Sequence, residues 1–218
     1  MLTPFEIIER TIAYVKQELA QAEGGHDWFH IERVWKSSKT IAQQEHANIL
    51  VVELGALLHD IADSKFNDGD EEIGPQKATT FLQSLALDIT TINQVVYIIR
   101  NISFKEGKEQ PAQRTAELDV VQDADRLDAI GAIGVARAFN YGGFKNRELH
   151  NPEIKPNLNM SKEEYKTSNA PTINHFYEKL LLLKDLMNTK TGKQLATQRH
   201  QFMEQYLTQF YNEWEGKT

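Results

Sequence analysis

Apolar residues recur at helical spacing along most of this 218-residue chain, and no segment shows the sustained alternation of a β-strand. At the start of the chain, Thr3 is a candidate helix cap, Pro4 suits the first helical position, and Glu6 can complete a capping box. The periodicity indicates a helix from there to just before Gly24. It predicts further helices at 28–46, 51–62, 75–85, 89–99, 115–139, 173–188 and 193–214. The sequence therefore predicts an all-α fold.

Residues 140–171 interrupt this pattern, with three prolines, two glycines and many asparagines. A loop of this length inside a compact chain is more often a functional lid or pocket wall than a linker. The alternative is a plain surface connection. The length of the chain suits a single domain, 1–218, in which this irregular loop precedes two C-terminal helices.

Composition and charge exclude several classes of protein. The chain has no cysteine, which excludes disulfides, thiolate zinc sites and iron–sulfur clusters. Its net charge is −7 and it has no long basic run, so we expect neither a nucleic-acid polymer nor an anionic membrane as partner. The first residues do not resemble a signal peptide, and no apolar segment approaches membrane-spanning length. We therefore expect a cytoplasmic protein; nothing in the sequence indicates its oligomeric state.

The pair His59-Asp60 closes the apolar run 51–58. An imidazole and a carboxylate at the end of a buried helix are costly to desolvate unless something binds them, and a divalent metal ion satisfies both. A His-Asp pair is weak evidence by itself, because a helix end with a solvated carboxylate produces the same pattern. Its place after a mostly apolar run favours the metal site.

Two other segments carry candidate ligands. One contains His26 and His30, four residues apart, and the other places Asp123, Asp125 and Asp128 among apolar neighbours. His26 is interpreted as a helix cap or as a hydrogen-bond partner of a ligand. Asp123 is the main competitor of Asp125, and Asp128 is expected to form a salt bridge.

The order of His30 in His-x-x-Arg-Val, then His59-Asp60, then Asp125 resembles the pattern of the HD-domain metal-dependent phosphohydrolases, most of all their small single-domain bacterial members. The resemblance implies an HD-domain-like helical bundle with its core at about 26–130, in which these four residues bind a divalent metal. It also implies a small phosphorylated substrate. The family includes nucleotidases, phosphodiesterases and pyrophosphohydrolases.

The chemistry of the four side chains agrees with this resemblance. Two imidazoles and two carboxylates suit Mn²⁺, Mg²⁺, Ni²⁺, Co²⁺ or Fe²⁺ and leave positions for water, which can attack phosphorus when the metal lowers its pKa. Asp63, on the same predicted helical face as His59, is the candidate proton acceptor. Asp123 and His26 are candidates for supporting the ligands. Phosphate charge requires cations, and the predicted set is Arg33, Lys65, Arg100 and Arg126.

The number of metal ions can be inferred from the histidines. Between His59 and His150 the chain has none, whereas HD proteins with two metals add imidazole ligands in that interval. Arg100-Asn101 stands near where such a ligand is expected. We therefore predict one metal ion. Of the other histidines, His175 is expected to be packed, and surface positions are expected for His46, His150 and His200.

The sequence thus predicts a metal-dependent phosphohydrolase that acts on a small nucleotide, as a nucleotide pyrophosphohydrolase or a nucleotidase. The alternative is a non-catalytic regulatory or ligand-binding module that retains the metal for structure. A helical interaction protein without metal is the third possibility.

Overall fold

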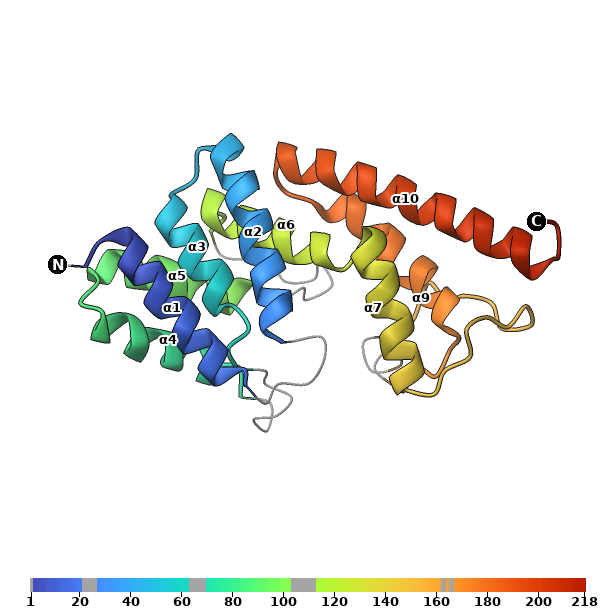
Figure 1. Cartoon of the computed structure of the whole chain (residues 1–218), viewed down its shortest axis with the longest axis horizontal. Coiled ribbons are helices and arrows are strands. Elements are labelled where there is room, and N and C mark those ends of the chain that lie inside the picture. Colours follow the sequence, from blue (N-terminus) through green and yellow to red (C-terminus); the bar gives the residue numbers. More distant parts are fainter. Residues whose placement is uncertain (1, 21–26, 63–69, 103–112, 162–163, 165–166) are drawn as a thin grey trace. The chain divides into compact units, whose positions relative to one another are not determined.

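The computed structural model describes residues 2–20, 27–62, 70–102, 113–161, 164 and 167–218, and every regular element within them is a helix (Figure 1). The predicted all-α fold is confirmed. In chain order the elements are α1 (Pro4–Glu18), α2 (Trp28–Glu45), α3 (Ile49–Leu58), α4 (Ile73–Ser84), α5 (Ile89–Asn101), α6 (Ala116–Asp128), α7 (Gly131–Phe144), α9 (Thr172–Glu178), the 3₁₀ helix η2 (Leu180–Leu186) and α10 (Lys190–Trp214).

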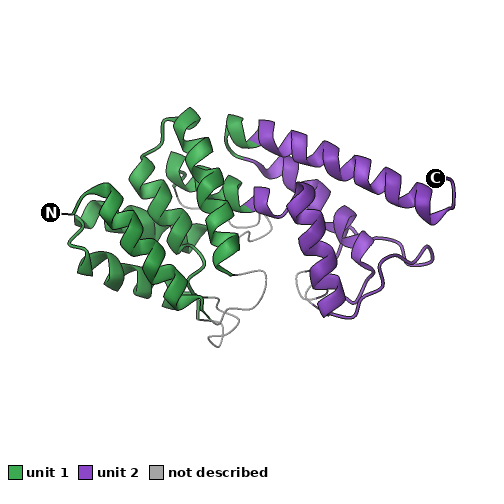
Figure 2. Ribbon diagram, viewed as in Figure 1, with its two compact units in different colours: residues 1–125, 188–192 green, residues 126–187, 193–218 purple. Residues whose placement is uncertain are grey.

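The chain forms two compact units (Figure 2). Unit 1 consists of Met1–Asp125 together with Asn188–Gly192, and unit 2 consists of Arg126–Met187 and Lys193–Thr218. Helices α6 and α10 each contribute residues to both units. The short segment Asn188–Gly192 therefore belongs to unit 1 although the chain on either side of it belongs to unit 2.

Helix starts in unit 1 follow the predicted capping chemistry. At α1, the Glu6 backbone N–H donates to the Thr3 hydroxyl over 3.3 Å, and the Thr3 N–H donates to the Glu6 carboxylate over 2.8 Å. At α5, the Thr91 N–H donates to the Asp88 carboxylate over 2.9 Å. Each contact satisfies a backbone group that the first turn of a helix leaves without a partner. The predicted capping box and the predicted Asp88 cap are both confirmed.

Helix α3 lies at the core of unit 1, where it packs against α1, α2 and α5. A helix that is apolar on nearly every side is stable only when it is enclosed in this way. Gly55 lets α5 approach closely, because a Cβ at this position would lie 2.9 Å from Cδ1 of Ile98. The α3 residues without exposed surface are Val51, Val52, Leu54, Ala56, Leu57 and Leu58.

The predicted single helix at 115–139 is wrong, because the helical conformation is interrupted between α6 and α7. Ile130 is extended, and Gly131 has a φ of +76°, in the left-handed region that glycine adopts without strain. One turn later, α7 passes so close to the carbonyl of Ala129 that a side chain at Gly134 would overlap it. The small residues of this segment thus permit a sharp change of direction.

The C-terminal boundaries also differ from the prediction. Helix α7 continues to Phe144, where Asn146 adopts a φ of +53° and the Arg147 N–H donates to the carbonyl of Gly142 over 2.8 Å. These contacts close the helix with a left-handed residue. The predicted helix at 173–188 is instead α9 followed by the 3₁₀ helix η2, separated by Lys179 with φ −144° and ψ −57°.

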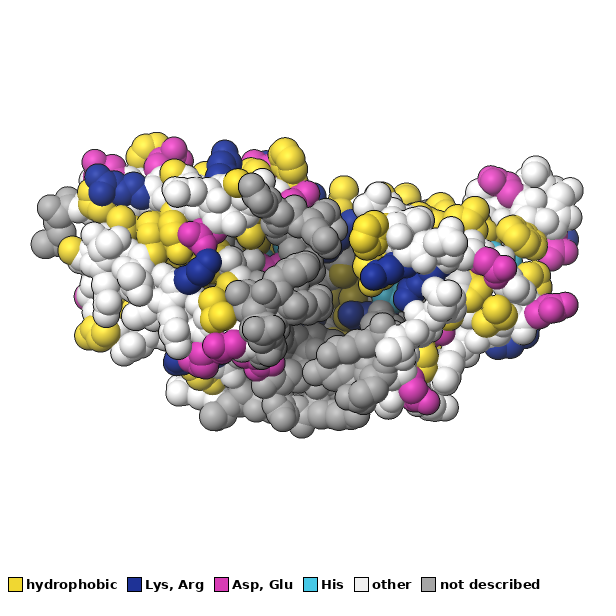
Figure 3. All heavy atoms as spheres, turned by 90° about the horizontal axis from the view of Figure 1, so that it is seen from below, with side chains coloured by type: hydrophobic (Ala, Val, Ile, Leu, Met, Phe, Trp, Pro, Cys, Tyr) yellow, Lys and Arg dark blue, Asp and Glu magenta, His cyan; other side chains and the backbone are white. Residues whose placement is uncertain are grey.

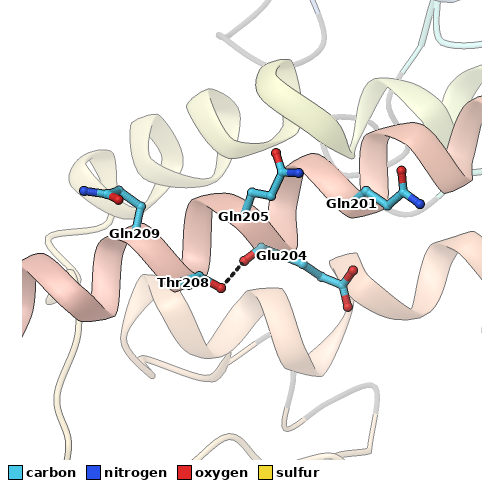
Figure 4. A pocket seen from close by; sticks show the side chains of 5 residues that line it. All are labelled: Gln201, Glu204, Gln205, Thr208 and Gln209. Carbon is cyan, nitrogen blue, oxygen red and sulfur yellow. Dashed lines mark hydrogen bonds between the residues drawn. The ribbon is translucent and has the colours of Figure 1, made fainter.

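Unit 2 is held together by aromatic packing against one face of α10. Phe176 is fully buried and its ring stacks on Tyr206 at 6.1 Å, while Phe139 lies 6.0 Å from both. The outer face of α10 is polar and forms a shallow hollow (Figure 4), where the Thr208 hydroxyl donates to the Glu204 carbonyl over 2.9 Å. The hollow has no cation or imidazole in its lining, which is Gln201, Glu204, Gln205, Thr208 and Gln209.

None of the helices in the described ranges is both long enough and apolar enough to cross a membrane.

The break before α7 yields a prediction. We expect Gly134→Ala to lower the free energy of unfolding by about 1–3 kcal/mol, because the new methyl group must displace the carbonyl of Ala129. Gly143→Ala, in the same helix with open space around it, should be neutral or raise stability by about 0.5–1 kcal/mol. Urea unfolding of both variants checks this. Equal effects at the two positions would contradict the account of the break.

Candidate metal centre

Three of the predicted ligands lie together in unit 1. His30 is in the first turn of α2, and His59 and Asp60 follow α3 directly. One ligand atom from each residue lies within 4.8 Å of the others. Within the described ranges, no other group of three His, Asp or Glu residues has this spacing.

Asp125, from α6, reaches the same place. Its Oδ1 lies 3.5 Å from Nε2 of His30 and 3.9 Å from Nε2 of His59. Around an octahedral ion with bonds of about 2.1 Å, ligand atoms are separated by about 3.0 Å when adjacent and about 4.2 Å when opposite. Both distances from Asp125 fall in that interval. The ligand atoms of His30, His59 and Asp60 are at most 4.8 Å apart, a bound slightly above the interval. Asp125 therefore lies close enough to both imidazoles to be a fourth candidate ligand.

The end of α3 orients His59. The helix stops at Leu58, earlier than the predicted 62, and Nδ1 of His59 lies 2.8 Å from the carbonyl oxygen of Ala56. A carbonyl only accepts hydrogen bonds, so Nδ1 carries the hydrogen and Nε2 keeps its lone pair. This is the arrangement in which metal-binding histidines are usually held, because the bond at one ring nitrogen fixes the direction of the other.

His30 is positioned by the start of α2. The carboxylate of Asp27 accepts from the His30 N–H over 2.9 Å and caps the helix. The residue that caps α2 is therefore Asp27, whereas the sequence analysis gives the preceding residue, His26, as a candidate cap. His30 is 3% exposed, and its ring meets that of His59 edge-on with centroids 5.4 Å apart. The imidazole of His30 is thus held in place from both its backbone and its ring.

Asp123, predicted to support a ligand, accepts hydrogen bonds from a distant segment of the chain. It has no exposed surface, and its Oδ1 accepts from the Asn188 N–H over 2.8 Å. Its Oδ2 accepts from both the N–H and the hydroxyl of Thr189, each over 2.7 Å. A side chain at Gly192 would overlap this carboxylate. These hydrogen bonds anchor α6 to the segment Asn188–Gly192, two residues before Asp125.

Gln122 strengthens the same anchor. Its amide donates to the carbonyl of Asn101 at the end of α5 over 2.7 Å, and its Oε1 accepts from the Asn188 side chain over 3.1 Å. The part of α6 that carries Asp125 is therefore tied to two other segments of unit 1. The sequence analysis does not predict these hydrogen bonds to Asn101, Asn188 and Thr189. The only sequence signal for them is the polar run at 188–191, between the two predicted C-terminal helices.

The predicted phosphate-binding cations have different surroundings. Arg33 is half-buried, three residues after His30 on α2. Arg100 forms a two-pronged ion pair with Glu72, with N–O distances of 2.6–3.2 Å, which raises the pKa of Arg100 and lowers the pKa of Glu72. Arg126 belongs to unit 2 and donates to the carbonyl of Leu186 over 2.6 Å. The charge of Arg100 is thus already balanced by a carboxylate.

Three of the predicted site residues lie outside the described residues: His26, Asp63 and Lys65. The predicted common face of Asp63 and His59 requires a helix through both residues, whereas α3 ends at Leu58.

Two histidines predicted at the surface, His150 and His200, are part-buried. The ring of His150 lies 4.9 Å from that of Trp214 and also contacts Phe210, and burial lowers the pKa of His150. The side chain of His200 is 13% exposed and lies 3.4 Å from Glu204. The contacts of His150 come from the distant helix α10, whereas the contact of His200 is with the next turn of its own helix. His46 is exposed, as predicted.

Comparison with known proteins agrees with this site. A family model described as HD domain matches residues 28–130. The crystal structure of an HD-superfamily hydrolase from Bacillus thuringiensis is 44% identical, covers 98% of this chain and 99% of its own, and superposes with a TM-score of 0.79. The chain belongs to the HD-domain family. The predicted resemblance is confirmed, and the matched HD residues contain His30, His59, Asp60 and Asp125.

Other relatives align over almost their whole length. YpgQ of Bacillus subtilis, an uncharacterised protein, is 35% identical over 209 residues, which cover 95% of this chain and 94% of YpgQ. A crystal structure of YpgQ in complex with ADP superposes with a TM-score of 0.78, with 32% identity and 97% of each chain covered. A structure from Lactobacillus plantarum gives a TM-score of 0.81 at 36% identity, with 99% of this chain and all of its own covered.

The contrast between Asp123 and Asp125 yields a second prediction. In metal-free protein, Asp123→Asn should lower the free energy of unfolding by about 1–3 kcal/mol, because an amide nitrogen would face backbone and hydroxyl donors that lose an acceptor. Asp125→Asn should change it by less than about 1 kcal/mol, since this carboxylate is 38% exposed. Urea unfolding in EDTA compares the two variants. Similar losses at both positions would show that Asp123 is not the anchor.

Proposed function

We propose that this HD-domain protein is a metal-dependent phosphohydrolase that acts on small nucleotides, and that His30, His59, Asp60 and Asp125 hold its metal ion. The observation that carries the proposal is the grouping of His30, His59 and Asp60, with the carboxylate of Asp125 within 3.5 Å and 3.9 Å of the two imidazoles. The His59 contact with Ala56 supports it, because that contact leaves a ring nitrogen able to bind metal.

The donor set determines which metals fit. Two nitrogen and two oxygen ligands suit Mn²⁺, Mg²⁺, Ni²⁺, Co²⁺ or Fe²⁺, with octahedral positions left for water and substrate. When bound, such an ion lowers the pKa of a coordinated water and polarises a phosphoryl oxygen. Arg33 lies three residues from His30, so the two side chains leave the same side of α2. We propose that Arg33 binds a phosphate oxygen of the substrate.

The nucleotide class is supported by a relative. YpgQ was crystallised with ADP, and it aligns with this chain over 97% of both. ADP contains a phosphoanhydride and a phosphate ester, the bonds cleaved by a pyrophosphohydrolase or a nucleotidase. We propose one of these two reactions for this chain.

We also propose a single metal ion for each chain. In the described ranges the candidate centre contains two imidazoles, and the sequence has no histidine between His59 and His150. Imidazole is the commonest ligand for these ions, so a second ion would lack its usual partner.

Metal binding can be tested with one substitution in α2 and one at the residue that follows it. His30→Asn should weaken Mn²⁺ binding roughly tenfold or more, because it removes an imidazole ligand. His46→Asn should leave it unchanged, since His46 is exposed at the end of the same helix and asparagine tolerates its φ of +53°. Isothermal titration and elemental analysis measure affinity and stoichiometry. Two ions for each wild-type chain would contradict the single-metal proposal.

Hydrolysis can be tested on a panel of nucleoside mono-, di- and triphosphates with Mn²⁺, Mg²⁺, Co²⁺ and Ni²⁺. We expect release of phosphate or pyrophosphate from at least one nucleotide, loss of that activity in His59→Ala, and retention in His46→Asn. Chromatography of the products identifies the bond that is cleaved. A protein that binds metal but turns over no nucleotide would instead be a regulatory or ligand-binding module, and full activity in His59→Ala would refute the proposed centre.

A further inference from the structure

Asp123 is a buried carboxylate whose hydrogen-bond donors lie 65 and 66 residues later in the chain. On the face shown in Figure 3, carboxylate, lysine and arginine side chains lie at the surface of the molecule. Asp123 instead has no exposed surface, and it accepts from Asn188 and Thr189. Burying a carboxylate costs free energy, and each hydrogen bond that it accepts offsets part of that cost. These donors therefore help to fix the position of α6.

The Thr189 hydroxyl is the central group of this contact. It donates to Oδ2 of Asp123 over 2.7 Å and accepts from the Gly192 N–H over 2.8 Å. A hydroxyl has a single hydrogen, so its donation to Asp123 leaves the oxygen lone pairs to accept from Gly192. Thr189 is 8% exposed. One buried hydroxyl thus joins α6 to the first turn of α10.

The same segment also holds α2. The Thr191 N–H donates over 2.7 Å to the carboxylate of Glu45, the last residue of α2, and this hydrogen bond lowers the pKa of Glu45. Figure 2 shows the start of α10 in the colour of unit 1, to which α2 also belongs. The segment Asn188–Gly192 therefore contacts both α2 and α6, the helices that carry His30 and Asp125.

We propose that Asn188–Gly192 is a clasp that holds two of the metal ligands at the right spacing, and that Thr189 is a positioning residue of the metal centre. The proposal rests on the proposed function, which assigns His30 and Asp125 to the metal ion. Nε2 of His30 lies 3.5 Å from Oδ1 of Asp125, and the clasp joins the two helices from which these atoms come. If the clasp is loosened, metal binding must also restore this spacing, which lowers the affinity.

The test measures the Mn²⁺ affinity of full-length variants by isothermal titration. Thr189→Val keeps the shape of the side chain but removes its hydroxyl, and we expect it to weaken Mn²⁺ binding roughly tenfold. Thr189→Ser keeps the hydroxyl and should bind Mn²⁺ nearly as tightly as the wild type. Glu45→Ala removes the acceptor of the Thr191 N–H and provides a second variant if Thr189→Val fails to fold.

A control is needed for loss of stability by itself. Gly142→Ala serves this purpose, because a side chain at this position in unit 2 would overlap the hydroxyl of Thr172. We expect this variant to be less stable than the wild type and to bind Mn²⁺ with unchanged affinity.

Hydrogen exchange provides a second readout. Coupling between two sites is reciprocal, so a clasp that strengthens metal binding must itself be stabilised by the metal. In the wild type, Mn²⁺ should slow exchange of the backbone amides of Asn188, Thr189 and Thr191, measured by mass spectrometry of a peptide that contains them. In Thr189→Val the same peptide should show less slowing.

Several outcomes would overturn the clasp: unchanged Mn²⁺ affinity in Thr189→Val, equal weakening in Thr189→Ser, equal weakening in Gly142→Ala, or exchange at 188–192 that Mn²⁺ does not slow. His30→Asn separates these from failure of the centre. If His30→Asn weakens binding and Thr189→Val does not, the clasp alone is wrong. If the wild type binds no Mn²⁺, or His30→Asn binds it equally well, the proposed centre is wrong and the clasp with it. A protein that meets the binding expectations but hydrolyses no nucleotide would refute only the proposed reaction.

Discussion

The candidate metal centre depends on the contact between the His59 ring and the carbonyl of Ala56. In a helix that continued to residue 62, this carbonyl would accept from the backbone N–H of residue 60, and the imidazole would have no fixed orientation. Because α3 ends at Leu58, the carbonyl of Ala56 can accept a hydrogen bond from Nδ1 of His59. In the neutral ring, Nε2 then keeps its lone pair. The end of the helix thus fixes the direction of the candidate ligand through one hydrogen bond.

Two carboxylates on α6 have opposite surroundings for a simple geometric reason. Residues two apart in an α-helix project about 200° apart around its axis. Asp123 therefore meets three donors from Asn188 and Thr189, while Asp125 approaches the imidazoles of His30 and His59. The fully buried carboxylate is satisfied by hydrogen bonds within the protein, and the part-exposed one faces the candidate metal centre. One turn of α6 thus holds the helix to the segment Asn188–Gly192 through Asp123 and directs Asp125 toward the two imidazoles.

Sequence reasoning succeeded where the signal is local and failed where a distant residue decides. The Thr3 capping box, the Asp88 cap and the helical periodicity depend on residues within one or two turns, and the structure confirms them. The break at Gly131 was missed because glycine and alanine fit both a close-packed helix and a sharp turn. The His, His-Asp and Asp pattern identified the HD family correctly, since the types and order of its residues are visible without coordinates.

The cations show why residue type alone cannot locate a phosphate site. Arg100 was chosen for its charge and its place in the sequence, but Glu72, 28 residues earlier, balances that charge. Arg147, which is not in the predicted set, contacts a backbone carbonyl and an aromatic ring, neither of which carries a negative charge. An arginine oriented by neutral partners keeps its full attraction for an anion, whereas one oriented by a carboxylate must first give up that partner. The partner that fixes a cation, and not the cation itself, therefore decides whether it can bind phosphate.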